Sequence, residues 1–297
     1  DLEEARIWQR ETAEALELLE ARSNVNLNGA RDVREVVITA QRGVVIDAGV
    51  LLDIRHTLRL ATTLKRTLGR MDYQYPLLAE IVSEVEECRE VQDAVEKAID
   101  DSGEVKDSAS ARLAIIRRDL KIAFDKLQTK ITRIATSRAN QPLLQESLVT
   151  MRNGRYVIPL KADHKGKIKG IVHDSSSSGA TLFIEPMETV ELNNQWRELQ
   201  IAEEKEIRRI LLALTELVAD YSESIVRTVE VLGYLDLTFA KAEYALEQRC
   251  VKPTLVGFEP KANPDHPGST IYFKAARHPL LTGKVVPIDV EFDERTW

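Results

Sequence analysis

The chain has 297 residues, a formal net charge of −7 at pH 7, and 43% hydrophobic, 30% charged and only 5% aromatic residues. These values fit a soluble globular protein of one large or two to three small domains. No stretch approaches 18 uninterrupted apolar residues and no signal-peptide pattern is present, so the sequence predicts no transmembrane helix. The abundance of Leu, Ala, Glu and Arg predicts long helices rather than a broad sheet.

The two cysteines, Cys88 and Cys250, lie far apart, and neither belongs to a C-x-x-C pair. This spacing argues against a disulfide framework and against a metal site. Two isolated thiols fit a reducing cytosol, so we expect a cytoplasmic protein. Since no transmembrane helix is predicted, we also expect no membrane partner. The sequence begins at Asp1 rather than Met, and we therefore expect the natural N-terminus to lie upstream.

Helical signals dominate residues 1–110, which we interpret as a helical core domain. Gly43 ends a short helix, Asp47 can cap the next one, and proline is permitted in the first turn of a helix that starts at Tyr75-Pro76. The run Asp100 to Gly103 is a turn signal. The sequence thus predicts helices over 1–22, 31–41 and 47–68, and from residue 75 onward.

After this turn the chain carries an apolar seam at three- and four-residue spacing, and the same phase returns beyond residue 190 with an interruption near Glu203. Such a seam favours a coiled-coil partner. We expect two long helices to form an antiparallel arm within residues 111–214, about 45 Å long for roughly 30 residues. Residues 215–250 would return to the body, with a further helix over 236–249. The seam consists of Leu113, Ile116, Leu120, Ala123, Leu127, Ile131 and Ile134, then Leu192, Trp196, Leu199, Ile207, Ile210, Leu214, Leu217, Tyr221, Thr228 and Leu232.

A β-rich, basic island separates the two helices, at about residues 145–186, and we expect it to form the tip of the arm. The segment between Thr150 and Ser175 contains six basic and two acidic residues. Its local charge of +4 leaves −11 for the rest of the chain. Such a tip suits contact with the phosphates of rRNA or DNA. The alternative is a solvated edge whose lysines prevent aggregation. The basic side chains are Arg152, Arg155, Lys161, Lys165, Lys167 and Lys169.

Three other features of the sequence have a functional and a structural interpretation. Ser176 and Ser177, in the run Ser175 to Gly179, can contact phosphate or form a polar loop between strands. His173 and Asp174 are adjacent on a strand and point to opposite faces, so a structural role is favoured over a catalytic pair. The carboxylates Glu84, Glu86, Glu87 and Glu90 fit a solvated face rather than a metal site.

The composition changes in residues 251–297, which contain six prolines and short β-type runs at Thr270–Phe273, Val285–Val286 and Val290. We interpret this segment as the opening strands of a different domain. Since the short β-type runs continue almost to Trp297, we expect that domain to be truncated in this chain.

Several ungapped strings resemble the second bacterial type of MutS, a group of MutS paralogues that lack a mismatch-reading domain and carry a C-terminal Smr domain. The resemblance covers essentially the whole chain. The clamp region of the family is matched by Arg155-Tyr-Val-Ile-Pro-Leu-Lys161, His173-Asp174 and Ser178-Gly-Ala-Thr-Leu-Phe-Ile-Glu-Pro186. Further matches are Val105-Lys-Asp-Ser-Ala-Ser110, Val190-Glu-Leu-Asn-Asn194, Ala276-Arg-His-Pro-Leu280 and Val285-Val-Pro287.

The resemblance implies a homodimeric ATPase in which lever helices, over residues 1–110 and 215–250, carry an arm whose tip is a clamp. Residues 251–297 would then begin the ATPase domain, with His278, Val285 and Val286 near the adenine of ATP. The cofactors of the complete protein would be ATP and Mg²⁺. The family is associated with splitting of collided ribosomes in translation quality control, and with suppression of recombination through branched DNA, with nuclease activity linked to the Smr domain.

The chain departs from this family in what it lacks. It contains no G-x-x-x-x-G-K-[ST] phosphate loop, because Gly166-Lys167 and Gly283-Lys284 are each followed by an aliphatic residue. It also has no Smr domain, so we expect this segment alone to have no catalytic residues, no cofactor and neither ATPase nor nuclease activity. We expect the tip to grip the ribosome, with branched DNA as the alternative. A hypothesis of another class is a coiled-coil scaffold that binds protein.

Overall fold

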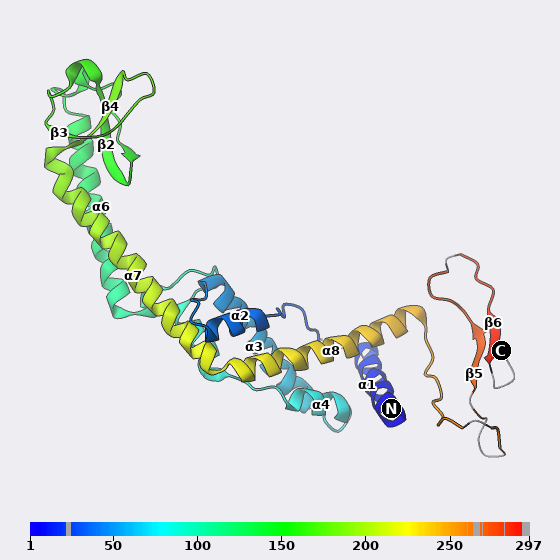
Figure 1. Cartoon of the computed structure of the whole chain (residues 1–297). Helices are drawn as coiled ribbons and strands as arrows, with labels where there is room; N and C mark the ends of the chain where they lie inside the picture. The colour runs from blue at the N-terminus through cyan, green and yellow to red at the C-terminus, as the bar shows by residue number, and fades with distance from the viewer. Residues whose placement is uncertain (22–24, 260, 264–267, 269, 282, 293–297) are drawn as a thin grey trace. The chain divides into compact units, whose positions relative to one another are not determined.

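The structure, a computed structural model, describes residues 1–21, 25–259, 261–263, 268, 270–281 and 283–292. Helices account for most of these residues, and two small antiparallel sheets complete the fold (Figure 1). The chain is therefore an α+β protein dominated by helix, as its composition predicts. No helix within the described ranges is long and apolar enough to cross a membrane.

The residues pack into two compact units, and each unit is assembled from separate stretches of chain. Unit 1 comprises residues 1–34, 56–88 and 223–297, and unit 2 comprises residues 35–55 and 89–222. The four functional segments expected from the sequence stay a prediction, because packing groups residues by contact and not by role.

Unit 1 is a helical bundle around one apolar core. It contains α1 (Leu2–Glu20), most of α3 (Ala48–Gly69), α4 (Pro76–Ser83) and nearly all of α8 (Ser222–Gln248). Pro76 stands in the first turn of α4, and the Glu14 carboxylate of α1 accepts hydrogen bonds from the Leu77 and Leu78 backbone N–H groups that the turn leaves free. The core includes Leu18, Leu64, Leu68, Leu78, Val82, Leu235 and Phe239.

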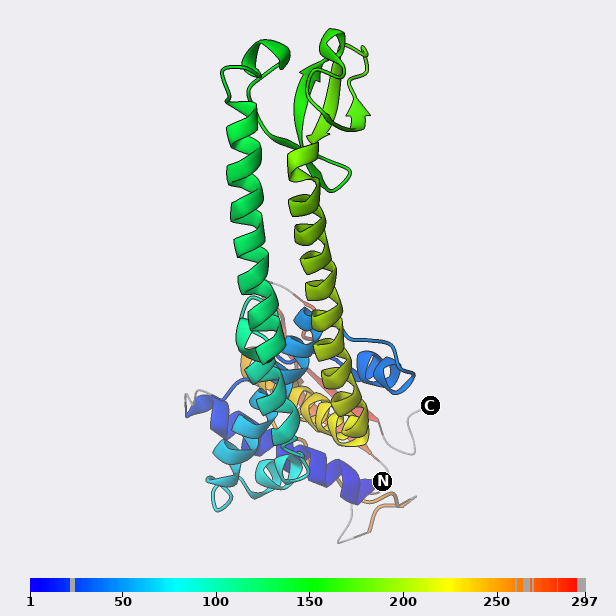
Figure 2. The ribbon, with the colours of Figure 1, turned by 90° about the vertical axis from the view of Figure 1, so that its left-hand side faces the viewer.

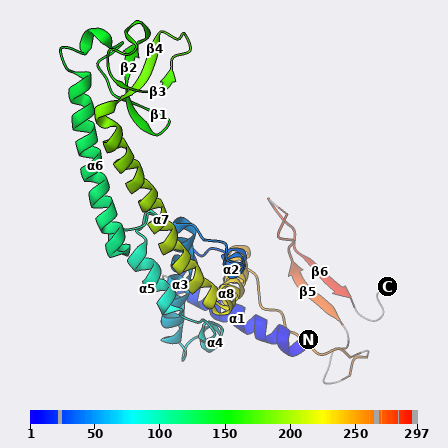
Figure 3. The same ribbon diagram turned by 60° about the vertical axis from the view of Figure 1, so that its left-hand side comes forward.

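Unit 2 contains α2 (Arg34–Gln41, from residue 35), the start of α3, α5 (Arg89–Ala98), η1 (Asp107–Ala109) and two longer helices. These are α6 (Ala111–Ala135) and α7 (Val190–Asp220), which lie side by side and antiparallel (Figures 2 and 3). The predicted seam of α6 is confirmed, because all its members are buried except Leu120, which is half-buried. Ser110 caps α6 by accepting a hydrogen bond from the Leu113 backbone N–H.

The second seam does not belong to one helix. The spacing predicts the same phase to Leu232 and a separate helix from Asp236, but α7 ends at Asp220 and α8 then runs unbroken to Gln248. The break falls at Tyr221, whose hydroxyl donates to Glu90, and the buried Ser222 hydroxyl accepts from Gln41. These contacts join residues far apart in sequence, so local spacing carries no signal for the break.

A four-stranded antiparallel sheet lies at one end of the α6–α7 pair (Figures 2 and 3), and its strand order is β1-β2-β4-β3. Asn153-Gly154, both with positive φ, make the two-residue turn between β1 and β2. One face of the sheet packs on the end of α6 through Ile131, Ile158, Leu160 and Ile184. The strands are β1 (Thr150–Arg152), β2 (Arg155–Lys161), β3 (Gly170–Ser175) and β4 (Thr181–Pro186), with η2 (Gln141–Leu143), η3 (Ala162–His164) and η4 (Met187–Thr189) alongside.

The sheet is fastened to both helices by an aromatic cluster and by one buried amide. Tyr156 of β2 lies between Phe124 of α6 and Trp196 of α7, with ring centroids 5.7 and 5.1 Å away. The Asn193 side chain of α7 is fully buried and pairs with the Tyr156 backbone, accepting from its N–H at 3.0 Å and donating to its carbonyl at 3.2 Å. The tip expected from the sequence is therefore a folded extension of the helix pair.

The last described residues form a separate hairpin of β5 (Ile271–Ala276) and β6 (Ile288–Phe292). The strand expected at Thr270–Phe273 is thus confirmed in outline, and Val290 lies in β6. Val285 and Val286 lie in the connection rather than in a strand, where Pro287 follows them directly. Pro260, Pro264, Pro267 and Trp297 lie outside the described residues.

Candidate nucleic-acid interface

Three of the six basic side chains predicted at the tip are free. Lys165, Lys167 and Lys169 are exposed on the connection between η3 and β3, and no described residue forms an ion pair with them. Ile168, between two of these lysines, packs against the core of the sheet. Because Ile168 packs against the sheet, the side chains on either side of it point to solvent. The connection therefore exposes three cations that have no ionic partner among the described residues.

Arg155 has a different environment. Its Nη1 donates to Glu185 Oε1 at 3.2 Å, and Glu185 is only 1% exposed in the middle of the sheet. The Nε2 atom of His173 lies 2.6 Å from the other oxygen of the same carboxylate. A buried carboxylate needs such partners, so Arg155 and His173 hold β2 and β3 to β4 and the structure assigns Arg155 a mainly structural contact.

Glu185 is not among the site residues that the sequence predicts. The signal was present, because a glutamate in the apolar run Thr181-Leu-Phe-Ile-Glu-Pro186 is unusual for a strand and calls for a cationic partner. The prediction that His173 and Asp174 do not pair with each other agrees with the structure. His173 contacts Glu185, whereas Asp174 lies 3.3 Å from Arg152 Nε, and the strand register shifts between Val172 and Asp174.

Arg152 and Lys161 are also engaged, although less deeply. The guanidinium carbon of Arg152 lies 4.3 Å above the Phe183 ring, a cation–π contact next to the Asp174 ion pair. The Lys161 ammonium donates to the Pro142 carbonyl at 3.0 Å. Both side chains remain half-exposed, so they can add charge at the edge of the lysine cluster.

The serine loop uses most of its hydrogen-bonding groups internally. The Ser176 hydroxyl accepts from the Thr181 backbone N–H at 3.1 Å, and the Gly179 backbone N–H donates to the Ser176 carbonyl at 2.8 Å. Ser177 is exposed at the tip of this turn. The loop therefore closes β3 onto β4, and Ser177 is one of its exposed residues, together with Ser175 and Ser178.

The residues expected near ATP lie on the β5–β6 hairpin. His278 is exposed, and its Nδ1 accepts from the Leu280 backbone N–H at 3.2 Å. Val286 is 75% exposed and Val285 is half-buried. The two valines share one connection with Gly283-Lys284, and no catalytic arrangement surrounds them among the described residues.

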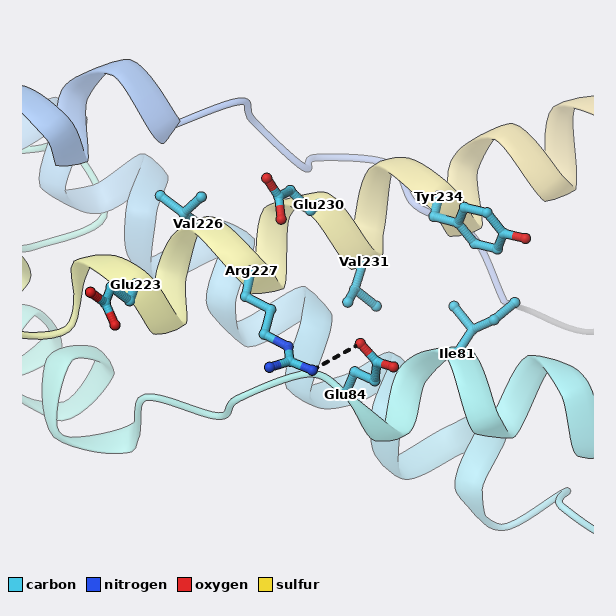
Figure 4. Close-up of a pocket in the computed structure, with 8 residues that line it drawn as sticks. All are labelled: Ile81, Glu84, Glu223, Val226, Arg227, Glu230, Val231 and Tyr234. Atoms are coloured by element: carbon cyan, nitrogen blue, oxygen red, sulfur yellow. Dashed lines mark hydrogen bonds and ion pairs between the residues drawn. The ribbon is translucent and has the colours of Figure 1, made fainter.

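A groove in unit 1 is unsuited to a polyanion (Figure 4). It has a volume of about 660 Å³ and an apolar lining of Ile81, Val231 and Tyr234, with three glutamates and one arginine around it. That arginine, Arg227, already pairs with Glu84 at 3.2 Å. The other carboxylates suggested by the sequence are also hydrogen-bonded, Glu86 to Ser224 and Glu90 to Tyr221. No cluster of metal-ligating side chains occurs in the described part of the chain.

Comparison with known proteins gives a consistent result. No protein-family model matches the chain. It is 42% identical over 291 residues to a protein named endonuclease MutS2 from Thermomicrobium roseum, which covers 96% of this chain and 36% of that relative. Proteins of the same name from Alkaliphilus oremlandii and a Geobacillus species are 38% and 40% identical over 97% and 96% of this chain, and over 35% and 36% of their own length. The chain spans about a third of the length of these relatives, and it belongs to the MutS2 type of MutS paralogues.

Proposed function

We propose that the β1–β4 sheet is a clamp that grips the phosphate backbone of a nucleic acid, at the end of an arm formed by α6 and α7. The observation that carries this proposal is the cluster of Lys165, Lys167 and Lys169, exposed and without an ionic partner among the described residues. Ile168 packs the segment that carries these lysines against the sheet, and the contacts of Glu185 hold the strands of the sheet together. Lysine contacts of this kind position a backbone without reading its sequence.

In the complete protein the helices of unit 1 would act as levers, moved by ATP and Mg²⁺ bound to an ATPase domain that begins in the β5–β6 hairpin. Two copies would then close their clamps on one substrate. The family membership supports a MutS-type ATPase, and the relatives' name, endonuclease, supports nucleic acid as the substrate class. We take rRNA on a collided ribosome as the substrate, with branched DNA as the second candidate.

Co-sedimentation of the chain with ribosomes tests this proposal, with branched DNA as competitor at low and moderate salt. The test variant is Lys165→Glu, Lys167→Glu and Lys169→Glu. Arg155 is left unchanged because its replacement would remove a cationic partner from the buried Glu185 carboxylate. We expect ribosome affinity to fall by roughly tenfold or more, and the slope of log affinity against log salt to fall by about two to three, because each phosphate contact contributes about 0.7–0.9.

A matched control carries the same charge change on the arm. Lys121→Glu, Lys126→Glu and Lys205→Glu replace exposed lysines of α6 and α7, and this variant should bind nearly as the parent does. Equal binding of parent and clamp variant would remove the lysine cluster from the mechanism. Release of the parent onto branched DNA would assign the clamp to DNA, and binding that ignores salt would favour a protein-binding scaffold.

A further inference from the structure

A second basic surface lies in unit 1, in a groove between α1 and the extended residues 252–255. The groove has a volume of about 560 Å³. Its polar lining consists of Glu3, Arg6, Gln9, Arg10, Lys252 and Thr254. Three cations against one carboxylate give the groove a formal charge of +2, in a chain whose net charge is −7.

The groove is built by side chains that tie the helix to the extended segment. Arg6, Gln9 and Arg10 share one face of α1, because residues three and four apart lie on the same side of a helix. Gln9 Nε2 donates to the Pro253 carbonyl at 2.9 Å, and Arg6 Nη2 donates to the Leu255 carbonyl at 3.3 Å. A capping box of Asp1 and Glu4 starts α1, and it fixes the N-terminal end of the helix, which is the end nearest to these side chains.

The three cations differ in availability. Arg6 Nη1 forms an ion pair with Glu3 at 2.6 Å, and Arg6 Nη2 donates to the Leu255 carbonyl. The Arg6 guanidinium is therefore already engaged in contacts that form the groove. Arg10 and Lys252 are exposed, and no described residue pairs with either of them. Two cations therefore remain uncompensated on opposite walls, one from the helix and one from the extended segment.

We propose that this groove is a binding site for a phosphate group. Each phosphate of a nucleic acid backbone carries one negative charge and a free oligophosphate carries more than one, so two uncompensated cations attract either ligand. The Arg10 guanidinium offers a planar fork of donors to two phosphate oxygens, Lys252 offers a point charge, and the Thr254 hydroxyl is a further donor. The groove of Figure 4, in the same unit, carries three glutamates and would repel the same ligand.

The phosphate can come from a free oligophosphate or from the backbone of a nucleic acid strand, and the two sources require different probes. Sodium pyrophosphate tests the first, and a short single-stranded DNA labelled with fluorescein tests the second. The clamp proposed above would also bind the DNA probe. Its lysines lie on unit 2 and stay intact in every variant of this groove, so only the loss of binding in a groove variant reports on the groove.

The experiment is a titration of the whole chain with each probe, followed by calorimetry for pyrophosphate and by fluorescence anisotropy for DNA. We expect Arg10→Glu with Lys252→Glu to weaken pyrophosphate binding by roughly tenfold or more, because two charge-assisted contacts become repulsive. The neutral pair Arg10→Gln with Lys252→Gln should fall between this variant and the parent. The backbone N–H of Thr254 should shift in the NMR spectrum when pyrophosphate binds.

Arg59→Glu with Arg66→Glu is the matched control, because both arginines are exposed on α3 without a described ionic partner. This control should bind pyrophosphate as the parent does. Groove-dependent binding of pyrophosphate identifies a free oligophosphate site, and groove-dependent binding of DNA alone identifies a backbone contact. No binding of either probe, or equal binding by parent and groove variant, would overturn the proposal even if the clamp test succeeds.

Discussion

Single buried polar residues hold the sheet of unit 2 in place. Glu185 gathers Arg155 and His173 from two neighbouring strands, and Asn193 pairs with the backbone of Tyr156. Each of these groups would cost free energy if it were buried alone, so each makes the arrangement of its partners specific.

Replacement of Asn193 by Ala should loosen the sheet from α7. The change removes two hydrogen bonds and leaves the part-buried Tyr156 N–H and carbonyl without the Asn193 side chain, which we expect to lower the free energy of unfolding by about 1–3 kcal/mol. Chemical denaturation measures the loss, and hydrogen exchange at Tyr156 locates it. Asn194→Ala, one residue further along α7, is the control and should have an effect within about 0.5 kcal/mol. Similar losses for both variants would contradict the assigned role.

Glu206 of α7 gives the helix pair a defined dependence on pH. Its carboxylate is buried and accepts hydrogen bonds from Arg209 and Ser110, which lower its pKa from the ordinary 4.5 to about 2. A carboxyl whose pKa is lowered by folding stabilises the fold fully above its unfolded pKa, and this contribution is lost as the pH falls toward 2.

The Glu206→Gln variant should therefore be less stable than the parent at pH 7, by about 1–3 kcal/mol. The difference should shrink as the pH falls from about 4.5 toward 2, because the parent carboxylate becomes protonated there. Unfolding by urea at a series of pH values measures both stabilities. A difference that stays constant over this range would mean that Glu206 is not held ionised by Arg209 and Ser110.

The α6–α7 pair is the element that carries the β1–β4 sheet. Its seam combines apolar contacts such as Leu127 against Trp196 with polar links near the start of α6, where Arg117 bonds to Glu203 at 2.7 Å. The interruption of the seam that the sequence places near Glu203 corresponds to this ion pair and to Glu206. The pair is thus apolar near the sheet and polar near the start of α6.

Truncation of Leu127 to Ala tests the packing of the two helices. Leu127 is fully buried in the seam, so its loss should destabilise unit 2 by about 2–5 kcal/mol and speed hydrogen exchange in both α6 and α7. Ile122, on the same helix, is 45% exposed, and Ile122→Ala should change stability by no more than about 0.5 kcal/mol. Faster exchange confined to α6 would show that the two helices do not support each other.

At the scale of the whole molecule, each unit of this acidic chain carries one of the two proposed cationic sites. One is the lysine cluster beside the β1–β4 sheet of unit 2, and the other is the groove between α1 and residues 252–255 of unit 1. Local cationic sites in a protein of net negative charge favour specific contact over general adhesion to polyanions. Because the two sites lie on different units, variants of one leave the other intact, and the two proposals can fail separately.

The sequence by itself determined the helical character, the seam of α6, the position of the β-rich tip and the family. These properties follow from local periodicity and from long ungapped strings, which need no knowledge of distant contacts. It also supplied the basic character of the tip, since charge can be counted along the chain.

Only the tertiary structure decided which of those charges are free. Arg155 faces the buried Glu185, 30 residues away in sequence, whereas Lys165, Lys167 and Lys169 meet no partner among the described residues. The break at Tyr221 and the groove beside Arg10 likewise depend on contacts between remote segments. The sequence shows which side chains are charged or polar. Some of these side chains form ion pairs and hydrogen bonds across strands and helices, and they are then not free to bind a ligand. The fold decides which side chains are paired in this way.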